Sequence, residues 1–148
     1  MSRDPLQLVY ELREKQVEQA QLAYQRAQKA LFEQRKQLQS LHQYRRQYIN
    51  QLSEKGSQGL SISDLGKYQQ FIVQIDTGLT QHQQGLVKYE HDVHAHKKMW
   101  IEAQITYKAM GMLLEKKAKK RATLEDKKEQ MLLDEFTTFQ YFQKQSGL

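Results

Sequence analysis

The sequence contains no cysteine, and it has one proline and one tryptophan among its 148 residues. Without cysteine, neither a disulfide framework nor a thiolate zinc site can form, and a reducing compartment suits the chain. The sole proline is Pro5, so nothing after it forces a helix to break. No apolar run approaches 18 residues, and no positively charged start leads into an apolar segment. We therefore expect neither a membrane span nor a signal peptide, and a cytoplasmic location.

What the chain does contain is charge and helix-forming residues. Hydrophobic residues make up 39% of the sequence and charged residues 27%, with a formal net charge of +6. This composition is typical of long helices and coiled coils rather than of a compact globular domain. A basic excess suits an acidic protein surface, nucleic acid or an anionic membrane, and by itself it favours none of them.

Apolar and aromatic residues recur at alternating spacings of three and four along the first third of the chain, which is the signature of one coiled-coil seam. The series is Leu6, Tyr10, Arg13, Val17, Ala20, Tyr24, Ala27, Leu31, Gln34, Leu38, Leu41, Arg45, Tyr48 and Leu52. Only two arginines and one glutamine interrupt its apolar character. Asp4 is a plausible N-cap and Pro5 suits the first helical position, so we expect a helix to begin there.

A second series with the same spacing follows a short interruption that contains two glycines, Gly56 and Gly59. We expect Gly56 to end the first helix and Ser61 or Ser63 to cap the second. The second series is Leu65, Tyr68, Ile72, Ile75, Leu79, His82, Leu86, Tyr89, Val93, His96, Trp100, Ala103, Tyr107, Met110 and Leu114. Beyond Leu114 the same register meets charged residues, so the seam ends there.

These patterns predict an all-α fold: a two-helix antiparallel coiled-coil hairpin whose second helix is longer and overhangs the first. We expect a single coiled-coil domain over 1–148, with helices at about 5–54 and 62–142 and a turn at about 55–61. In an antiparallel pair Leu6 would lie opposite roughly residue 110, because equal numbers of residues on either side of the turn span equal lengths. The last ~30 residues would then project beyond the first helix.

The sequence contains no recognisable catalytic motif. The one Gly-Lys pair, Gly66-Lys67, is followed by Tyr68, so it does not form a phosphate-binding loop. We expect no enzyme, no cofactor and no small-molecule substrate. His91, His94 and His96 lie close together, but they do not converge on one helix face, so a solvated stretch is favoured over a zinc site.

Three surface features have both a plain and a functional interpretation. Off-seam apolar residues near the turn either flank the seam or form a partner-binding patch; they are Tyr44, Ile49, Ile62, Phe71 and Val73.

A basic run is either a solvated helix or a contact for an acidic ring or for phosphates; it comprises Lys116, Lys117, Lys119, Lys120 and Arg121. It lacks the interleaved aromatics that would favour nucleic acid. An apolar tail favours docking over fraying, and its main side chains are Met131, Leu132, Phe136 and Phe139.

Specific residues also resemble a known family. They are Gln37-Leu38, Leu41, Tyr44, Tyr48 and Leu52, then the glycine-containing turn, then Tyr68-Gln69-Gln70-Phe71-Ile72, His82, Trp100 and Asp134-Glu135-Phe136. Together with the length, the basic charge and the two-helix plan, this pattern is similar to that of the FliJ family of flagellar export proteins. The Tyr-Gln-Gln-Phe-Ile segment is its most specific part.

The resemblance implies a component of the flagellar type III export apparatus that is similar to the stalk of rotary ATPases. Its expected partners are a hexameric export ATPase, the membrane export gate protein FlhA and export chaperones, at the cytoplasmic side of the inner membrane. The gate-facing surface implied by the resemblance comprises Gln37, Leu41, Tyr44, Tyr48, Phe71, Ile75, Gly78 and His82. The basic run and the apolar tail would enter the ATPase ring.

Other functions remain open from the sequence alone. A homodimeric scaffold would pair the two series between chains, and a stalk protein of a virulence-type secretion system would share the same plan. A nucleic-acid-binding coiled coil would use the basic run, and it is the least favoured.

Overall fold

The computed structural model describes residues 4–146, which form two helices and no strand. Helix α1 spans Pro5–Ser57 and helix α2 spans Ile62–Ser146. At the start of α1, Asp4 Oδ1 accepts a hydrogen bond from the backbone N–H of Leu6 at 3.0 Å. Pro5 costs nothing in the first turn, because an N–H there would have no helical partner. These two residues explain why the helix begins where it does.

The turn between the helices is short, and its glycine differs from the one that the sequence suggested. Gly56 lies inside α1, which continues to Ser57, whereas Gly59 has the positive φ of 94°. That backbone conformation favours glycine, because in any other residue the Cβ would be crowded by the adjoining backbone. The expectation for Gly56 was therefore wrong. Ser61 caps α2, since its Oγ accepts the backbone N–H of Asp64 at 3.1 Å.

Contacts group the chain into two compact units. The turn unit is Val17–Ala103, and the terminal unit comprises residues 4–16 and 104–146 of the described chain. Each helix contributes to both units. The predicted two-helix antiparallel hairpin is confirmed by the way that the helices pair within each unit.

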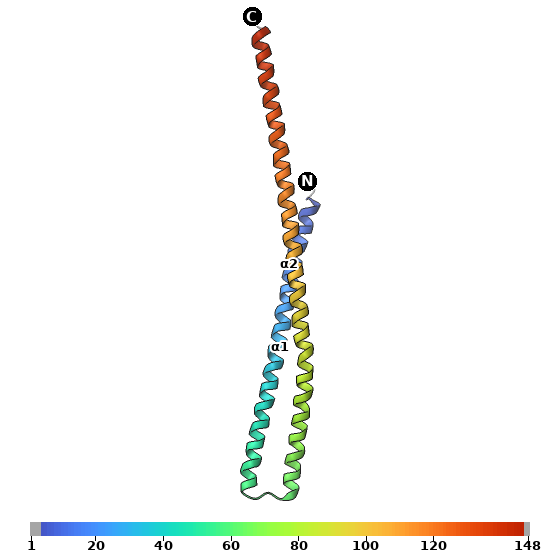
Figure 1. Cartoon of the computed structure of the whole chain (residues 1–148), viewed down its shortest axis with the longest axis vertical. Coiled ribbons are helices and arrows are strands. Elements are labelled where there is room, and N and C mark those ends of the chain that lie inside the picture. The colour runs from blue at the N-terminus through green and yellow to red at the C-terminus, as the bar shows by residue number, and fades with distance from the viewer. Residues whose placement is uncertain (1–3, 147–148) are drawn as a thin grey trace. The chain divides into compact units, whose positions relative to one another are not determined.

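In the turn unit, α1 and α2 run side by side and are joined at the turn (Figure 1). Among the described residues the most buried side chains are Leu31, Ile75 and Leu79, all of them on the predicted seam. Farther from the turn, the rings of Tyr24 and Trp100 stack with centroids 5.6 Å apart. Every position of the first series is at least partly buried, and in the second series only Leu65 is exposed. The core is therefore one strip of side chains between two helices.

In the terminal unit, the first turns of α1 pack against α2 around a pair of tyrosines. Tyr10 and Tyr107 stack with ring centroids 4.7 Å apart, and the Tyr10 hydroxyl donates to that of Tyr107 at 2.9 Å. Gly111 makes room for this stack, because a Cβ there would lie 3.2 Å from Cε2 of Tyr10. Beyond this contact α2 continues past the start of α1 (Figure 1), and every side chain from 121 to 146 is exposed. The predicted overhang is thus present.

The described helices include none that combines the length and the apolar character needed to cross a bilayer.

The glycines within α2 allow a test of helix propensity against packing. A Cβ added at Gly85 would meet nothing within 4 Å. Gly85→Ala is therefore expected to raise the free energy of unfolding by about 1 kcal/mol, the usual difference between alanine and glycine in a helix interior. Urea unfolding followed by circular dichroism measures this change. Gly111→Ala is the matched comparison, and it should gain less because the Tyr10 ring must move. Equal gains at both sites would contradict the close packing of Tyr10 on Gly111.

Candidate interaction surfaces

An aromatic cluster lies close to the turn and includes two residues of the predicted partner-binding patch. Tyr48 contacts Phe71 and Tyr68, with ring centroids 4.7 Å and 5.2 Å away, and Tyr44 meets the edge of Phe71 at 6.4 Å. The Tyr44 side chain remains 48% exposed. The cluster therefore packs within the turn unit and still presents an aromatic side chain to solvent.

Lys55 closes one side of this cluster. Its Nζ donates to the Tyr68 hydroxyl at 2.6 Å and lies 5.3 Å from the centre of that ring. This hydrogen bond raises the pKa of Lys55. Burial raises the pKa of the Tyr48 phenol, with smaller contributions from the neighbouring tyrosines. The cluster thus places the phenol of Tyr48 in a partly buried position near the Lys55 ammonium.

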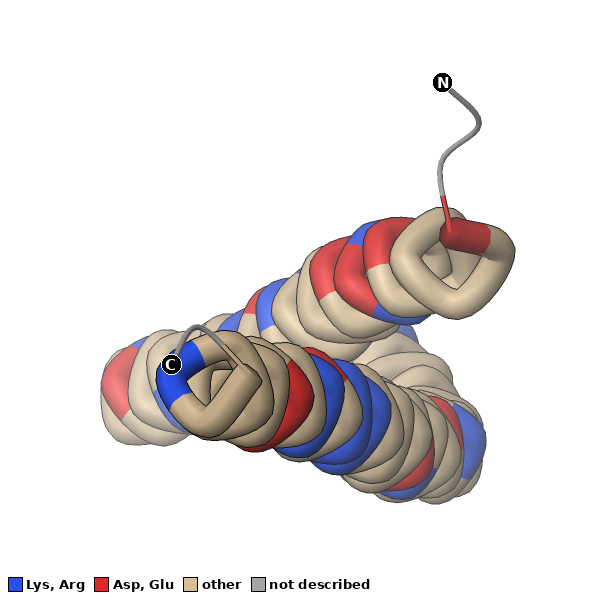
Figure 2. The backbone as a smooth tube through the Cα atoms, turned by 90° about the horizontal axis from the view of Figure 1, so that it is seen from above, with Lys and Arg blue, Asp and Glu red and all other residues tan. Residues whose placement is uncertain are grey.

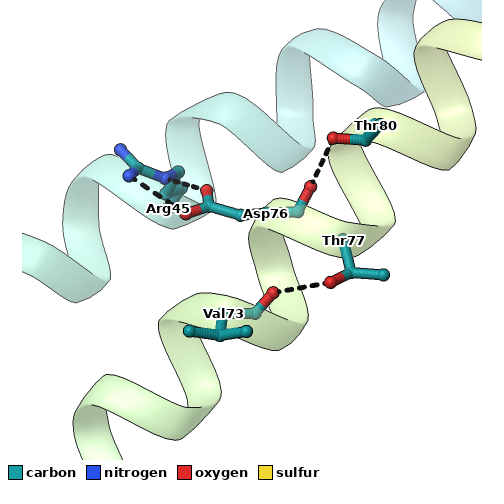
Figure 3. A network of polar contacts seen from close by, with 5 residues as sticks. All are labelled: Arg45, Val73, Asp76, Thr77 and Thr80. Atoms are coloured by element: carbon teal, nitrogen blue, oxygen red, sulfur yellow. Dashed lines mark hydrogen bonds and ion pairs between the residues drawn. The ribbon is translucent and has the colours of Figure 1, made fainter.

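Arg45 is a charged residue at a seam position, and an ion pair explains how the seam tolerates it. Its guanidinium binds Asp76 through Nε to Oδ1 and through Nη2 to Oδ2 at 3.4 Å (Figure 3). This contact raises the pKa of Arg45. Two threonines near Asp76 bond to the backbone of α2. The Thr80 hydroxyl donates to the backbone oxygen of Asp76 at 3.0 Å, and the Thr77 hydroxyl donates to that of Val73 at the same distance. A two-pronged pair of this kind adds geometric specificity to the contact between the two helices.

The structure distributes the predicted gate-facing residues over three levels of exposure. Gln37 and Tyr44 are exposed, Ile75 is buried, and the remaining five are partly buried: Leu41, Tyr48, Phe71, Gly78 and His82. His82 is held in the seam because its Nε2 donates to the backbone oxygen of Gln34 at 2.8 Å.

Three of these residues, Gln37, Leu41 and Tyr44, line one open groove on α1. The groove also includes Glu33, Lys36 and Ser40, which the sequence pattern did not single out because polar residues on an exposed helix face carry no distinguishing signal.

In the terminal unit, Asp4 joins the start of α1 to the basic run of α2. Asp4 Oδ2 accepts Lys117 Nζ at 2.8 Å and lies 3.8 Å from Arg121 Nη2. The hydrogen bond from Lys117 lowers the pKa of the Asp4 carboxyl, and the N–H of Leu6 adds to the effect. The sequence indicated Asp4 only as an N-cap. An open groove lies at this contact, lined also by Gln7 and Glu11 of α1 and by Leu114, Glu115 and Ala118 of α2.

The other three cations of the basic run are exposed: Lys116, Lys119 and Lys120. Lys119 lies 3.7 Å from Glu115, one helical turn away, and both side chains are largely in solvent. Figure 2 shows several blue bands of Lys and Arg along α2 behind its C-terminal end. The run therefore has two cations engaged by Asp4 and three that point to solvent.

The apolar tail carries large side chains on an exposed stretch of helix. Leu132, Phe136 and Phe139 recur at helical spacing, and each is at least 58% exposed. Met131 is 63% exposed beside them. The predicted apolar tail is therefore exposed along this part of α2, and its docking role stays a prediction.

The histidines near the middle of α2 do not form a metal site in the described part of the chain. His91 and His94 are exposed and His96 is partly buried at the seam. No group of three or more His, Asp or Glu side chains in residues 4–146 is placed to hold a metal ion.

A family model described as "Flagellar FliJ protein" matches residues 1–146. The chain belongs to the FliJ family. The Flagellar FliJ protein of Escherichia coli (strain K12) is 29% identical over 126 residues, which cover 85% of this chain and 86% of that protein. Membership of the family makes this chain a component of the flagellar type III export apparatus.

A solved structure has the same fold as this FliJ-family chain. It is a putative YscO homologue from Chlamydia trachomatis, with a TM-score of 0.61 and 21% sequence identity, and the match covers 99% of this chain and 93% of that one. The two chains therefore share the two-helix fold although their sequence identity is low.

Proposed function

We propose that this FliJ-family chain is a non-enzymatic coupler that binds the hexameric flagellar export ATPase through the basic run and the apolar tail of α2. The observation that carries the proposal is the C-terminal part of α2. There, five cations at residues 116–121, two of them bound to Asp4, are followed by a stretch that α1 does not cover and that carries an exposed apolar stripe including Phe136 and Phe139. A partner with an acidic rim and an apolar interior would satisfy both features.

Each part of this segment would make a different contribution. Charge steers association and falls off with salt, so the basic run would bring α2 to an acidic opening. Burial of large apolar side chains holds a complex together, so Leu132, Phe136 and Phe139 would anchor the inserted helix. A single helix, with no second helix beside it, is also narrow enough to enter a ring.

Removing residues 122–148 tests this proposal. The truncated chain keeps Tyr10, Tyr107 and both cations that bind Asp4, so we expect its thermal midpoint to stay close to that of the full chain. We expect it to lose stimulation of ATP turnover by the flagellar export ATPase. Turnover measured with equimolar and substoichiometric amounts of each form provides the readout. Full stimulation by the truncated chain would exclude the tail as the ATPase contact.

We further propose that the groove beside the aromatic cluster binds the export gate protein FlhA and that the hairpin handles export chaperones, at the cytoplasmic face of the inner membrane. Tyr44 supports the gate contact, because it is exposed, aromatic and borders the groove that Gln37 and Leu41 line. Aromatic side chains of this kind dominate the energetics of many protein interfaces.

A further inference from the structure

One carboxylate in the terminal unit has two roles. Asp4 caps α1 by accepting the N–H of Leu6 on Oδ1, and its backbone oxygen accepts the N–H of Gln7 at 3.0 Å. The other carboxylate oxygen, Oδ2, binds Lys117 and lies near Arg121. Both of these cations belong to the basic run. The beginning of α1 is therefore tied to the same charges that an acidic partner would use.

This contact is open to solvent and can be exchanged. The side chains of Lys117 and Arg121 are 43% and 63% exposed, and that of Asp4 is 25% exposed. Ion pairs at this level of exposure are weak because water and salt screen them. The open groove at the contact leaves the two cations accessible from the solvent side, and an incoming carboxylate would meet repulsion there from Glu11 and Glu115, which also line it.

We propose that Asp4 competes with the acidic partner of the basic run for Lys117 and Arg121, so that docking of the partner releases Asp4 and loosens the first turn of α1. The inference rests on the proposed function, since it takes the basic run as the contact of an acidic surface. Because coupling between two contacts is reciprocal, removing the Asp4 charge must strengthen partner binding by the same factor that binding weakens the Asp4 contact.

The variant Asp4→Asn separates the two roles of the residue. Asparagine caps helices about as well as aspartate, so α1 should still begin at Pro5. Its neutral amide cannot compete with a carboxylate for the two cations. We expect the affinity for an acidic probe to rise roughly two- to five-fold, the range that weak exposed ion pairs allow.

The experiment uses the full chain and fluorescein-labelled octaglutamate at low ionic strength. Anisotropy gives the affinity, and hydrogen exchange of the Leu6, Gln7 and Leu8 amides reports the first turn of α1. The matched control is Glu14→Gln, which removes the same charge from an exposed position on α1. In the wild type, octaglutamate should speed exchange at these amides. In Asp4→Asn the probe should bind more tightly than in Glu14→Gln and should leave exchange unchanged.

The outcomes separate this inference from the proposed function. Binding of octaglutamate that is absent, or that survives reversal of all five cations of the basic run to glutamate, means that the basic run is not an acid-binding site, and both proposals fall. Binding that those reversals remove, together with equal affinities for Asp4→Asn and Glu14→Gln, overturns the competition alone. The competition is also overturned if octaglutamate binds the wild type without changing amide exchange at Leu6, Gln7 and Leu8.

Discussion

Replacing Ile75 by alanine is expected to lower the free energy of unfolding by about 2 kcal/mol, the lower end of the range for truncating a large aliphatic core residue. Ile75 is 6% exposed, which makes it one of the most buried side chains of the described chain. The expected loss lies at the lower end because a core only one strip wide can close around a cavity or admit water. Urea unfolding followed by far-UV circular dichroism measures the change, and an unchanged slope would show that unfolding remains cooperative.

Tyr44→Ala provides the matched comparison, because both residues belong to the predicted gate-facing surface. Tyr44 is 48% exposed, so its loss should cost well under the amount expected for Ile75. If the groove beside the aromatic cluster binds FlhA, Tyr44→Ala should weaken that binding while the fold is retained. Ile75→Ala should weaken it only to the extent that it destabilises the turn unit. An Ile75→Ala chain as stable as the wild type would contradict the burial of this residue in the seam.

The heptad pattern predicted the pairing of the helices because the apolar residues of a coiled-coil seam recur at regular spacing along the whole sequence. Its polar exceptions also have local explanations that the sequence did not contain. Arg45 turns to Asp76, and His82 donates to the backbone oxygen of Gln34. Each of these bonds joins residues on different helices, so it depends on which side chains come opposite one another after the turn.

The turn itself shows why such details escape prediction. Two glycines three residues apart could each end α1, and the choice of Gly59 over Gly56 lengthens the helix to Ser57. The pairing of Tyr10 with Tyr107 nevertheless agrees with the register that the sequence predicted, so the longer helix changes the turn and not the alignment. The ion pair of Asp4 with Lys117 joins residues 113 positions apart, so it depends on side-chain geometry across the two helices, and the sequence indicated the cap but not this contact.

Residues 122–146 differ from the rest of the chain in what stabilises them. All of their side chains are exposed, so this part of α2 depends on helix propensity and on bonds within the helix. Most helical stability in proteins comes from packing an apolar face against a partner. The apolar tail therefore has the most to gain from an interface, and order gained on binding would offset part of the affinity.

Charge reversal of Lys116 and Lys120 together is expected to weaken binding to the flagellar export ATPase by about tenfold or more at low ionic strength, since each reversal replaces an attraction by a repulsion. Both side chains are exposed and neither belongs to the Asp4 contact, so the fold should be retained. The affinity of the wild type should fall as salt is raised, and that of the variant should depend much less on salt.

The control is the reversal of Lys127 and Lys128, two exposed lysines on the same helix whose replacement changes the net charge by the same amount. If general attraction between a basic chain and an acidic ring drives association, the two double variants should lose the same affinity. If the basic run is the site of contact, the loss should be concentrated in the Lys116 and Lys120 variant. Because both double variants change the net charge equally, the difference between their affinity losses reports the effect of where the charge lies. Equal losses would remove the basic run from the proposed interface.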